Sequence, residues 1–485
     1  MLENLEPKSV FHFFEEITKI PRPSNHEKAI SDYLIKFAED RGLEHYQDKS
    51  NNVIIIKEAT PGYENAAPVI LQGHMDMVCE KVQGSTKDME KEGIDLVVDG
   101  DWISGDGTTL GGDDGAAVAM ALAILDSKEL KHPRVEFLCT TGEEIGMVGA
   151  NALKDEDLSM LKGRLMINLD SEDEGVCTAG CAGAGSLLAD LPLERGGCTM
   201  ERRLIHVHGL EGGHSGQEIN KGRANGNLLV VRTLIALANA GCTRLIAMNG
   251  GKMDNTINKE SCAAVALGDV DQAKEIIARV EKEARNEFVL ADPDIHIDLE
   301  EIPADAEYAD WDPVTKECTQ QAITLMASLP NGVLRMSDAI PGLVETSLNL
   351  GIVSTTKDNL HLDTFVRSNV DSQLHDVLNR LIWVCEHIGA KARVEGEYPA
   401  WELVLHSAFR DKMQEIWKDM FGKEMEVVSI HAGVECGLLA TLLPGLDAVS
   451  IGPDLPGVHS TKEKLSIKST QHIYEFVCRV LEEAK

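Results

Sequence analysis

The segment Gln72–Val78, with the sequence QGHMDMV, follows the short apolar run Pro68–Leu71, which predicts a buried strand. Side chains two positions apart along a strand point to the same side, so we expect His74 and Asp76 to lie together where the strand ends. His74 can bind a metal ion through one ring nitrogen, and Asp76 can accept the other N–H and fix the ring's tautomer. The segment therefore predicts an α/β sheet with a metal-binding site at a strand end.

The composition is that of a globular enzyme with a large excess of negative charge. At 485 residues the chain is long enough for two domains. Its 80 Asp and Glu residues against 46 Lys and Arg give a net charge of −34, which argues against nucleic acid and anionic membranes as partners. We see no signal peptide and no apolar run of membrane-spanning length. The 11 cysteines are scattered, so we expect reduced thiols and a cytoplasmic protein.

The first third of the chain alternates helical and strand-like patterns. Ser24 and Glu27 fit a capping box, which predicts that a helix begins at Ser24 and ends near Gly42. The other expected elements are a helix at Val10–Ile20, strands at Asn52–Glu58, Arg134–Thr140 and Arg164–Leu169, a hairpin at Leu96–Ile103 and a buried helix at Asp114–Leu125. This alternation is typical of an α/β sheet with helices on both faces.

From about Gly185 the pattern becomes that of an α+β unit, and the α/β pattern resumes after Trp401. The α+β part has expected helices at Asn225–Ala240, Val270–Phe288 and Gln373–His387 and strands at Leu204–Leu210, Arg244–Asn249, Ala263–Leu267, Ile295–Glu300, Leu343–Ser354 and Asn359–Arg367. We therefore predict a discontinuous α/β domain, residues 1–184 and 398–485, with a mixed sheet flanked by helices, and an inserted α+β domain, residues 185–397. No internal repeat is visible.

Five short motifs in the α/β parts lie where predicted strands meet loops, which is where ligands bind in open α/β folds. They are Gly73–Asp76, Gly111–Gly115, Thr141–Glu144, Asn168–Glu172 and Gly457–Ser460. Each has an ordinary alternative: a lone histidine after a strand, a helix cap at Asp113-Asp114, or a solvated acidic pair at Glu143-Glu144. Together they supply two imidazoles and several carboxylates, a donor set that suits two zinc or manganese ions.

The combination of these motifs resembles the di-metal peptidase family of aminoacylases, glutamate carboxypeptidases and succinyl-diaminopimelate desuccinylases. Within that family it is most similar to the branch of bacterial aminoacyl-histidine (Xaa-His, or β-alanyl-histidine) dipeptidases. The strings that carry the resemblance are Gln72–Val78, Thr108–Asp113, Asp170–Gly175, Gly212–Gly216, Pro330–Arg335, Val344–Asn349 and His431–Gly437. The resemblance covers essentially the whole chain, including the inserted domain.

The resemblance implies a role for each residue of the metal site. Asp113 would bridge two ions, with Zn²⁺ expected and Mn²⁺ or Co²⁺ able to use the same donors. One site would be completed by His74 and Asp170, and the other by Glu144 and His459. The resemblance also implies that Asp76 orients His74, that Glu143 is the general base, and that the peptide bond Asp113–Asp114 is cis. The chemistry is consistent with these residue types, because two ions activate a water whose proton Glu143 can accept.

The resemblance implies that the inserted domain is a lid. It also implies which residues bind the substrate. His214 would stabilise the oxyanion in the active site of a partner subunit, which implies a homodimer through the lid. Asn255 would lie beside His214, and Arg367 would bind the substrate's carboxylate. Glu435, in the α/β domain, would receive its amino group. Without the resemblance, His214 reads as a turn residue and Arg367 as a salt-bridged surface arginine.

The resemblance implies hydrolysis of unblocked dipeptides, including Xaa-His and carnosine (β-alanyl-histidine). Alternatives within the family are an N-acyl amino acid deacylase and a tripeptidase or carboxypeptidase, and an alternative of another class is a metal-free binding protein on the same fold. Two departures bear on specificity. Asn258 stands where close relatives carry proline, so we expect a looser loop there, and Asp114 stands where asparagine is common, which adds charge beside the metals.

Overall fold

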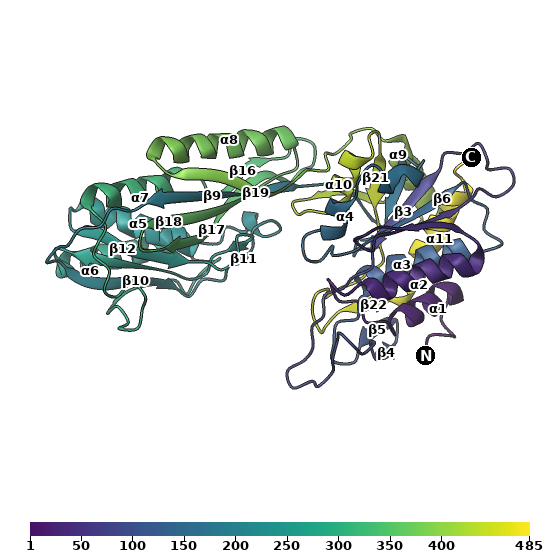
Figure 1. Ribbon diagram of the computed structural model, residues 1–485, viewed down its shortest axis with the longest axis horizontal. Coiled ribbons are helices and arrows are strands. Elements are labelled where there is room, and N and C mark those ends of the chain that lie inside the picture. Colours follow the sequence, from purple (N-terminus) through teal and green to yellow (C-terminus); the bar gives the residue numbers. More distant parts are fainter. The chain divides into compact units, whose positions relative to one another are not determined.

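An eight-stranded sheet and a nine-stranded sheet form the centres of two separate units (Figure 1). The computed structural model describes residues 1–485. Unit 1 consists of Met1–Gly180, Leu403–Ser429 and Val434–Lys485, and unit 2 of Cys181–Glu402 and Ile430–Gly433. The expected boundaries stood at 184/185 and 397/398, and the contacts within the chain place the division at 180/181 and 402/403, with residues 430–433 also in unit 2.

The sheet of unit 1 is mixed, as the sequence predicts. Its order is β1 (Glu44–Gln47), β2 (Val53–Lys57), β6 (Val135–Thr140), β3 (Val69–His74), β7 (Leu165–Asn168), β21 (Asp447–Ser450), β8 (Val176–Cys181) and β20 (Glu426–Ile430). β3 is parallel to both β6 and β7, and β7 is parallel to β21. The carboxyl ends of these neighbouring strands therefore lie at one edge of the sheet, and the loops that follow them carry the motifs.

Helices cover both faces of this sheet. α1 (Lys8–Ile17), α2 (Lys28–Arg41), α3 (Gly112–Asp126) and α11 (Ile467–Glu482) share a core on one face, while α4 (Val148–Ala152) and α10 (Glu435–Leu442) pack together on the other (Figure 1). α3 is buried all round from Ala116 to Leu125, which is what a helix of small and apolar residues predicts. The unit is completed by α9 (Ala408–Phe421) and a small sheet of β22 (Lys464–Ser466), β5 (Trp102–Gly105) and β4 (Leu96–Asp99).

The predicted capping box at Ser24 is wrong. α2 begins at Lys28, and its N-cap residue Glu27 makes no side-chain cap. Ser24 Oγ instead donates to Asp76 Oδ2 (2.7 Å), and Glu27 Oε1 accepts the N–H groups of Asn25 (2.9 Å) and Gly142 (3.1 Å). Both side chains therefore hold loops at the carboxyl ends of β3 and β6, and these tertiary contacts replace the local cap.

Unit 2 contains two copies of one topology, which we call modules A and B. Module A runs β10 (Glu201–His208), α5 (Gly226–Asn239), β12 (Thr243–Gly250), β14 (Ser261–Leu267), α6 (Val270–Glu287) and β15 (His296–Glu300). Module B runs β9 (Gly183–Pro192), α7 (Lys316–Ser328), β17 (Val344–Thr355), β18 (Asn359–Ser368), α8 (Asp371–Ile388) and β19 (Lys391–Tyr398). Each is therefore β-α-β-β-α-β.

The two modules join edge to edge through equivalent strands. The sheet order β15-β10-β14-β12-β17-β18-β9-β19 has module A in the strand order 4-1-3-2 and module B in the order 2-3-1-4, with β16 (Gly332–Met336) pairing β17 as well. β12 meets β17 antiparallel at Gly250 and Val353. The sequence shows no repeat because module A is inserted between the first strand and the first helix of module B. The duplication is therefore one of topology.

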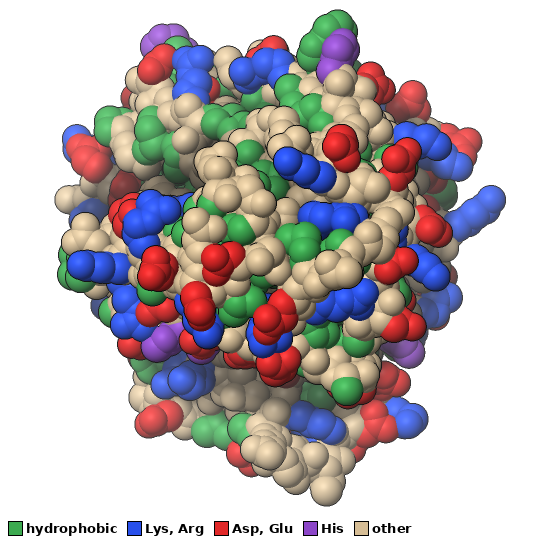
Figure 2. Space-filling view, turned by 90° about the vertical axis from the view of Figure 1, so that its left-hand side faces the viewer, with side chains coloured by type: hydrophobic (Ala, Val, Ile, Leu, Met, Phe, Trp, Pro, Cys, Tyr) green, Lys and Arg blue, Asp and Glu red, His purple; other side chains and the backbone are tan.

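The helices of both modules cover one face of the sheet of unit 2, where they form its main core (Figure 1). On the opposite face, a smaller cluster packs Trp311 and Tyr308 against Leu204, Ile246 and neighbouring strand residues of module A. On the face of the molecule shown in Figure 2, acidic and basic side chains are interspersed. None of the helices combines the length and the apolar character needed to cross a bilayer. None of the 11 cysteines forms a disulfide bond.

Candidate functional site

His74 is the last residue of β3, and its imidazole is 1% exposed. Its Nε2 lies 2.9 Å from Asp113 Oδ1 and 3.5 Å from Asp170 Oδ1, while its Nδ1 lies 3.4 Å from Asp76 Oδ1. Asp76 is fully buried and also accepts the backbone N–H of Glu143 (3.1 Å). Burial acts to raise the pKa of Asp76, but His74 and the other donors outweigh it and hold the pKa low. Asp76 thus connects the loop after β3 to the loop after β6.

Asp113 stands at the start of α3, where the backbone is unusual. Gly111 has a φ of 69°, and the Asp113–Asp114 peptide bond is cis, as the resemblance implies. Two buried residues that the sequence analysis missed hold this turn. Glu463 accepts the N–H groups of Leu110 (2.7 Å), Gly111 (3.1 Å), Gly112 (2.7 Å) and Asp113 (3.3 Å). Arg22 donates to the carbonyl oxygens of Met75, Asp76 and Gly111.

The five residues expected to hold metal form two overlapping triads. His74, Asp113 and Asp170 make one, and Asp113, Glu144 and His459 make the other, with the donor atoms of each triad within 4.8 Å of one another. His459 Nε2 lies 2.8 Å from Glu144 Oε2 and 3.2 Å from Asp113 Oδ2. Asp113 therefore presents one carboxylate oxygen to each imidazole, which is the arrangement that a bridging ligand needs.

The electrostatics of the triads show an uncompensated excess of carboxylates. Burial raises the pKa of Asp170 to about 7 and that of the neighbouring Glu172, which belongs to the same predicted motif but received no role from the sequence, also to about 7. Hydrogen bonds to Asp113 and Glu144 raise the pKa of His459 to about 11. For Asp113, the two imidazoles outweigh burial and lower the pKa. The raised pKa of His459 and the lowered pKa of Asp113 both follow from placing imidazoles among several carboxylates, and a bound cation would reduce the same excess of negative charge.

The donor set fits two divalent cations. It offers imidazole nitrogen and carboxylate oxygen in the mixture that zinc, manganese and cobalt accept. Glu144 Oε1 is buried and has no hydrogen-bond partner, which is costly for a carboxylate unless a cation or another donor satisfies it. The bridging position of Asp113 brings the two triads close enough to share one substrate.

Glu143 is in the same loop as Glu144 but is not part of either triad. Burial raises the pKa of Glu143 well above its ordinary value; His74 acts to lower it, and the neighbouring carboxylates, Asp170 first, act to raise it further. A carboxyl group in such surroundings takes up a proton readily at neutral pH. Glu143 therefore has the property that a general base needs, because it must first accept a proton and later release it.

Glu435 is the first residue of α10 and is fully buried. Its Oε2 accepts hydrogen bonds from Gln72 Nε2 and Thr140 Oγ1, both at 2.6 Å, while Oε1 has no partner. Burial raises the pKa of Glu435 to about 7. Gln72 and Thr140 lie on β3 and β6, so Glu435 joins the same edge of the sheet, with one oxygen free to accept a donor.

In unit 2, His214 lies on the short strand β11 (Gly213–His214), which pairs with β13 (Thr256–Ile257). Its Nδ1 accepts the N–H groups of Gly216 (3.2 Å) and Gln217 (3.1 Å), so the ring carries its proton on Nε2. Burial and then the charge of Arg367 lower the pKa of His214. His214 is therefore a neutral ring with one N–H available to donate.

Arg367 is 5% exposed and has no acidic partner, which contradicts the alternative of a salt-bridged surface arginine. Its Nη1 donates to Tyr398 Oη (3.2 Å), and its Nε has no hydrogen-bond partner. His431, which is also buried, hydrogen-bonds Asn369 Oδ1 (2.9 Å) and Ser347 Oγ (2.7 Å). Burial, followed by the charge of Arg367, lowers the pKa of His431 to about 3.

Gly216 shows how closely these residues approach one another. A Cβ at Gly216 would lie 2.9 Å from His214 Cε1, 3.1 Å from Arg367 Nε and 2.4 Å from the carbonyl oxygen of His431. His214 belongs to module A and Arg367 to module B, so the pairing of the modules brings them together in one chain. We call His214, Arg367, Tyr398 and His431 the unit 2 cluster. Sequence reasoning missed Tyr398 and His431, although His431 begins one of the strings that carry the resemblance.

Asn255 and Asn258 lie near the strand that carries His214. The carbonyl oxygen of Asn255 accepts the N–H of Ser215 (2.9 Å), which places Asn255 beside His214 as expected. Asn258 is buried, and its side chain donates to Asn227 Oδ1 (3.0 Å), while its carbonyl oxygen accepts the N–H of Gly226 (2.7 Å). The expectation of a looser loop at Asn258 is therefore wrong, because the amide makes bonds that proline lacks.

Comparisons with known proteins agree with this site. The model of peptidase family M20/M25/M40 matches residues 70–483. The cytosol non-specific dipeptidase of Escherichia coli (strain K12) is 36% identical over 486 residues, which cover 99% of this chain and 99% of the relative.

Among solved structures, the aminoacylhistidine dipeptidase of Vibrio alginolyticus matches with a TM-score of 0.89 and 35% identity, over 99% of this chain and 98% of that one. A tripeptidase of Staphylococcus aureus matches with a TM-score of 0.56 over 99% of both chains, but at 15% identity the likeness is one of fold alone.

Proposed function

The chain belongs to peptidase family M20/M25/M40, and on this premise we propose that it is a cytoplasmic metallo-dipeptidase that hydrolyses unblocked dipeptides, with Xaa-His dipeptides and carnosine among its substrates. The observation that carries the proposal is the pair of triads that share Asp113, with Glu143 beside them. The E. coli relative is a dipeptidase and the V. alginolyticus relative acts on aminoacylhistidine, and both match nearly the whole chain.

In this proposal His74, Asp113 and Asp170 hold one divalent ion, and Asp113, Glu144 and His459 hold the other, with Zn²⁺ expected and Mn²⁺ or Co²⁺ as alternatives. When bound, the two ions polarise the scissile carbonyl and lower the pKa of a water. Asp76 keeps the ring of His74 in its orientation through Nδ1. Arg22 and Glu463 do not contact the ions in this proposal. They hydrogen-bond the backbone of Asp76 and Asp113 and so hold these two residues in position.

Glu143 accepts the proton of the attacking water and then delivers it to the leaving amine. Its raised pKa supports both steps, and its backbone N–H is held by Asp76. Glu144 cannot take this role, because a carboxylate engaged with a metal ion is a poor proton carrier. The neighbouring positions thus supply one ligand and one base.

The substrate's termini are assigned to groups that lack partners. Glu435, with its free Oε1, is the proposed acceptor for the amino group, and Arg367 is the proposed donor to the carboxylate. His214, which carries its proton on Nε2, is the proposed donor to the oxyanion, with Asn255 beside it. A buried carboxylate that lacks a donor favours a free amine over an acylated one, and therefore a dipeptidase over a deacylase.

The homodimer through the lid, in which His214 serves the partner's active site, remains a prediction from the resemblance. The unit 2 cluster adds a restriction to it. Because His214 and Arg367 of one chain lie together, they must act on the same substrate molecule, whichever subunit holds that molecule.

Mixing inactive variants tests this restriction. In a mixture of His214→Ala and Arg367→Ala chains, no unit 2 carries an intact cluster, so we expect no recovery of activity. If the two residues instead serve different subunits, random dimers restore about a quarter of the sites. A mixture of His214→Ala and Glu143→Ala chains then separates action within one chain, which gives no recovery, from action across a dimer, whose presence light scattering checks independently.

The activity itself is tested with a panel of Ala-His, carnosine, a tripeptide and N-acetyl amino acids, using protein whose metal content has been measured. We expect turnover of the unblocked dipeptides, loss of turnover on chelation and its return with Zn²⁺. Turnover of the acetylated compounds alone would establish the deacylase instead, and turnover of the tripeptide alone would establish the tripeptidase.

A further inference from the structure

A group of histidines and acidic residues in unit 2 shares no residue with the triads or with the unit 2 cluster. It lies on the three neighbouring strands β15, β10 and β14 of module A. Ile205 and Val207 of β10 point into the core under the helices, so the alternate residues His206 and His208 point to the opposite face of the sheet. That face is only partly covered, since both histidines are half-buried.

The strand register places metal-binding side chains side by side on this face. His208 is directly opposite His296 of β15, and His206 is opposite Asp298. The ring centroids of His206 and His208 are 4.7 Å apart, and those of His208 and His296 are 5.2 Å apart. Two histidines at i and i+2 of one strand, with a histidine and an aspartate facing them on the next, make a two-by-two array of donors.

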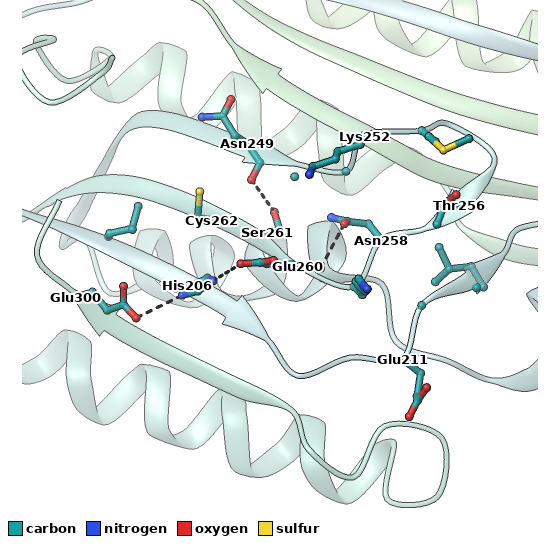
Figure 3. A pocket seen from close by; sticks show the side chains of 18 of the residues that line it. His206, Glu211, Asn249, Lys252, Thr256, Asn258, Glu260, Ser261, Cys262 and Glu300 are labelled. Carbon is teal, nitrogen blue, oxygen red and sulfur yellow. Dashed lines mark hydrogen bonds and ion pairs between the residues drawn. The ribbon is translucent and has the colours of Figure 1, made fainter. Parts of the chain in front are cut away.

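Acidic side chains surround the array. Glu260 Oε1 lies 2.9 Å from His206 Nε2, and Glu300 Oε1 lies 3.3 Å from His206 Nδ1 (Figure 3). Asp298 Oδ2 lies 2.8 Å from His208 Nε2. His206, Glu260 and Glu300 also line a cavity of about 750 Å³, so a solvated ion can reach them (Figure 3). Imidazole and carboxylate together, in an electronegative setting, are the donors that zinc-like ions bind.

We propose that module A binds one transition-metal ion of the zinc class through His206, His208 and His296, with Asp298 as the fourth ligand. Binding replaces the proton held by an imidazole and releases it to solvent. Each ring offers the ion one nitrogen, and for His206 the other nitrogen keeps its bond to Glu260 or Glu300, the outer partner that metal-bound histidines commonly have.

Two neighbouring residues, Arg285 and Cys262, bear on which groups can bind the ion. Arg285 Nη2 lies 2.9 Å from His296 Nδ1 and can only donate, so this nitrogen accepts, and a metal ion that binds it displaces Arg285. The ring nitrogens now face carboxylates or Arg285, so ligation requires the exposed rings to turn about their side-chain torsions. Cys262 is opposite His206 on β14, but burial raises the pKa of its thiol, so we do not include it among the ligands.

The experiment measures bound metal per chain in the full-length protein after Zn²⁺ loading and desalting. We expect His206→Ala/His208→Ala, and separately His296→Gln, to bind one ion fewer than wild type, with kcat/KM for the dipeptide unchanged. This difference does not depend on how many ions unit 1 holds. His361→Ala is the matched control, because His361 is a half-buried histidine of the same unit that pairs with a single acid, Asp190.

A calorimetric titration with Zn²⁺ provides the second readout. We expect it to lose one binding event in the double variant and in His296→Gln but to keep that event in His361→Ala. Circular dichroism without added metal shows whether each variant folds, and His296→Gln, at an exposed position, covers the case in which the double variant does not. The same metal content and the same titration in all four proteins would mean that the array is an ion-pair network only, and would overturn the proposal.

Discussion

The candidate site of unit 1, which comprises the two triads and Glu435, and the unit 2 cluster have opposite electrostatic imbalances. In unit 1, carboxylates outnumber imidazoles, and burial raises the pKa of Asp170 and Glu435 to about 7. In unit 2, Arg367 is buried without an acidic partner, and its charge adds to burial in lowering the pKa of His214 and His431. The site of unit 1 thus has an excess of negative charge, and the unit 2 cluster has an excess of positive charge.

In the proposed function, Glu435 and Arg367 are assigned to the two ends of the substrate, so this difference bears on which substrates are accepted. Metal ions bound by the triads would compensate part of the charge of unit 1, but Glu435 lies outside both triads and its Oε1 still lacks a donor. The Nε of Arg367 lacks an acceptor in the same way. An unblocked dipeptide carries an ammonium group at one end and a carboxylate at the other, so it supplies both missing charges. A blocked substrate supplies only one.

The largest expected effect separates the two neighbouring acids of unit 1. Glu143→Ala should lower kcat about 10²- to 10⁴-fold, the usual contribution of a general base, and leave the metal content at the wild-type value. Glu144→Ala should lose activity together with one bound ion. Metal analysis alongside steady-state kinetics checks both results. Wild-type turnover in Glu143→Ala would disprove its role as the base.

The second prediction removes the unbalanced positive charge of unit 2. Arg367→Met should lower kcat/KM for Ala-His by about 10- to 150-fold, since a hydrogen bond to a charged group contributes about 1.5–3 kcal/mol. Arg335→Met is the matched control, because Arg335 is exposed and paired with Asp338 and Glu345. On a dipeptide amide, which has no carboxylate, Arg367→Met and wild type should perform alike. An equal loss on both substrates would show a structural role instead.

The third prediction removes the unpaired negative charge of unit 1 without changing its shape. Glu435→Gln should raise KM for Ala-His about tenfold, because an uncharged amide binds an ammonium group less strongly. The bonds from Gln72 and Thr140 can persist, since the amide oxygen still accepts. With an N-acetylated dipeptide the substitution should have little effect. If KM changes equally for both substrates, Glu435 supports the sheet edge and does not bind the amine.

In unit 1, the sequence predicted the residues of the candidate site better than the residues that hold those in place. His74, Asp113, Glu144, Asp170 and His459 could be found because each lies in a short motif of the α/β parts, and the resemblance assigned them as ligands. Arg22 and Glu463 could not be found in this way, because they bind backbone groups that are distant in the sequence, such as those of Gly111. No local sequence pattern indicates such contacts. The predicted helix cap at Ser24 was wrong for the same reason, because Ser24 donates its hydrogen bond to the distant Asp76 and not to the helix.

For unit 2 the sequence predicted the individual elements but not their relation. The antiparallel pair β17 and β18 and the helices α5, α6 and α8 lie within a few residues of the expected ranges. The duplication stayed hidden because module A interrupts module B, so equivalent elements do not follow one another at a fixed spacing. The approach of His214 to Arg367 depends on that duplication, and it could therefore be known only from the fold.

The last prediction concerns His431, whose uncharged state keeps Arg367 the main positive charge of the unit 2 cluster. Its pKa of about 3 in the folded protein lies below the ordinary value of 6.5, so the folded ring stays neutral while the unfolded chain takes up a proton. The unfolded state therefore gains stability relative to the folded state as the pH falls from 6.5 towards 3. At pH 5 this amounts to about 2 kcal/mol.

The variant His431→Asn has no proton to take up, and its amide can still donate to Asn369. We expect it to be less stable than wild type at pH 8, because Ser347 loses its acceptor, but to lose less stability on acidification. Urea midpoints of both proteins at pH 8 and pH 5 measure the difference. A parallel decline of the two proteins would mean that His431 titrates normally and that protonating it costs the unit 2 cluster nothing.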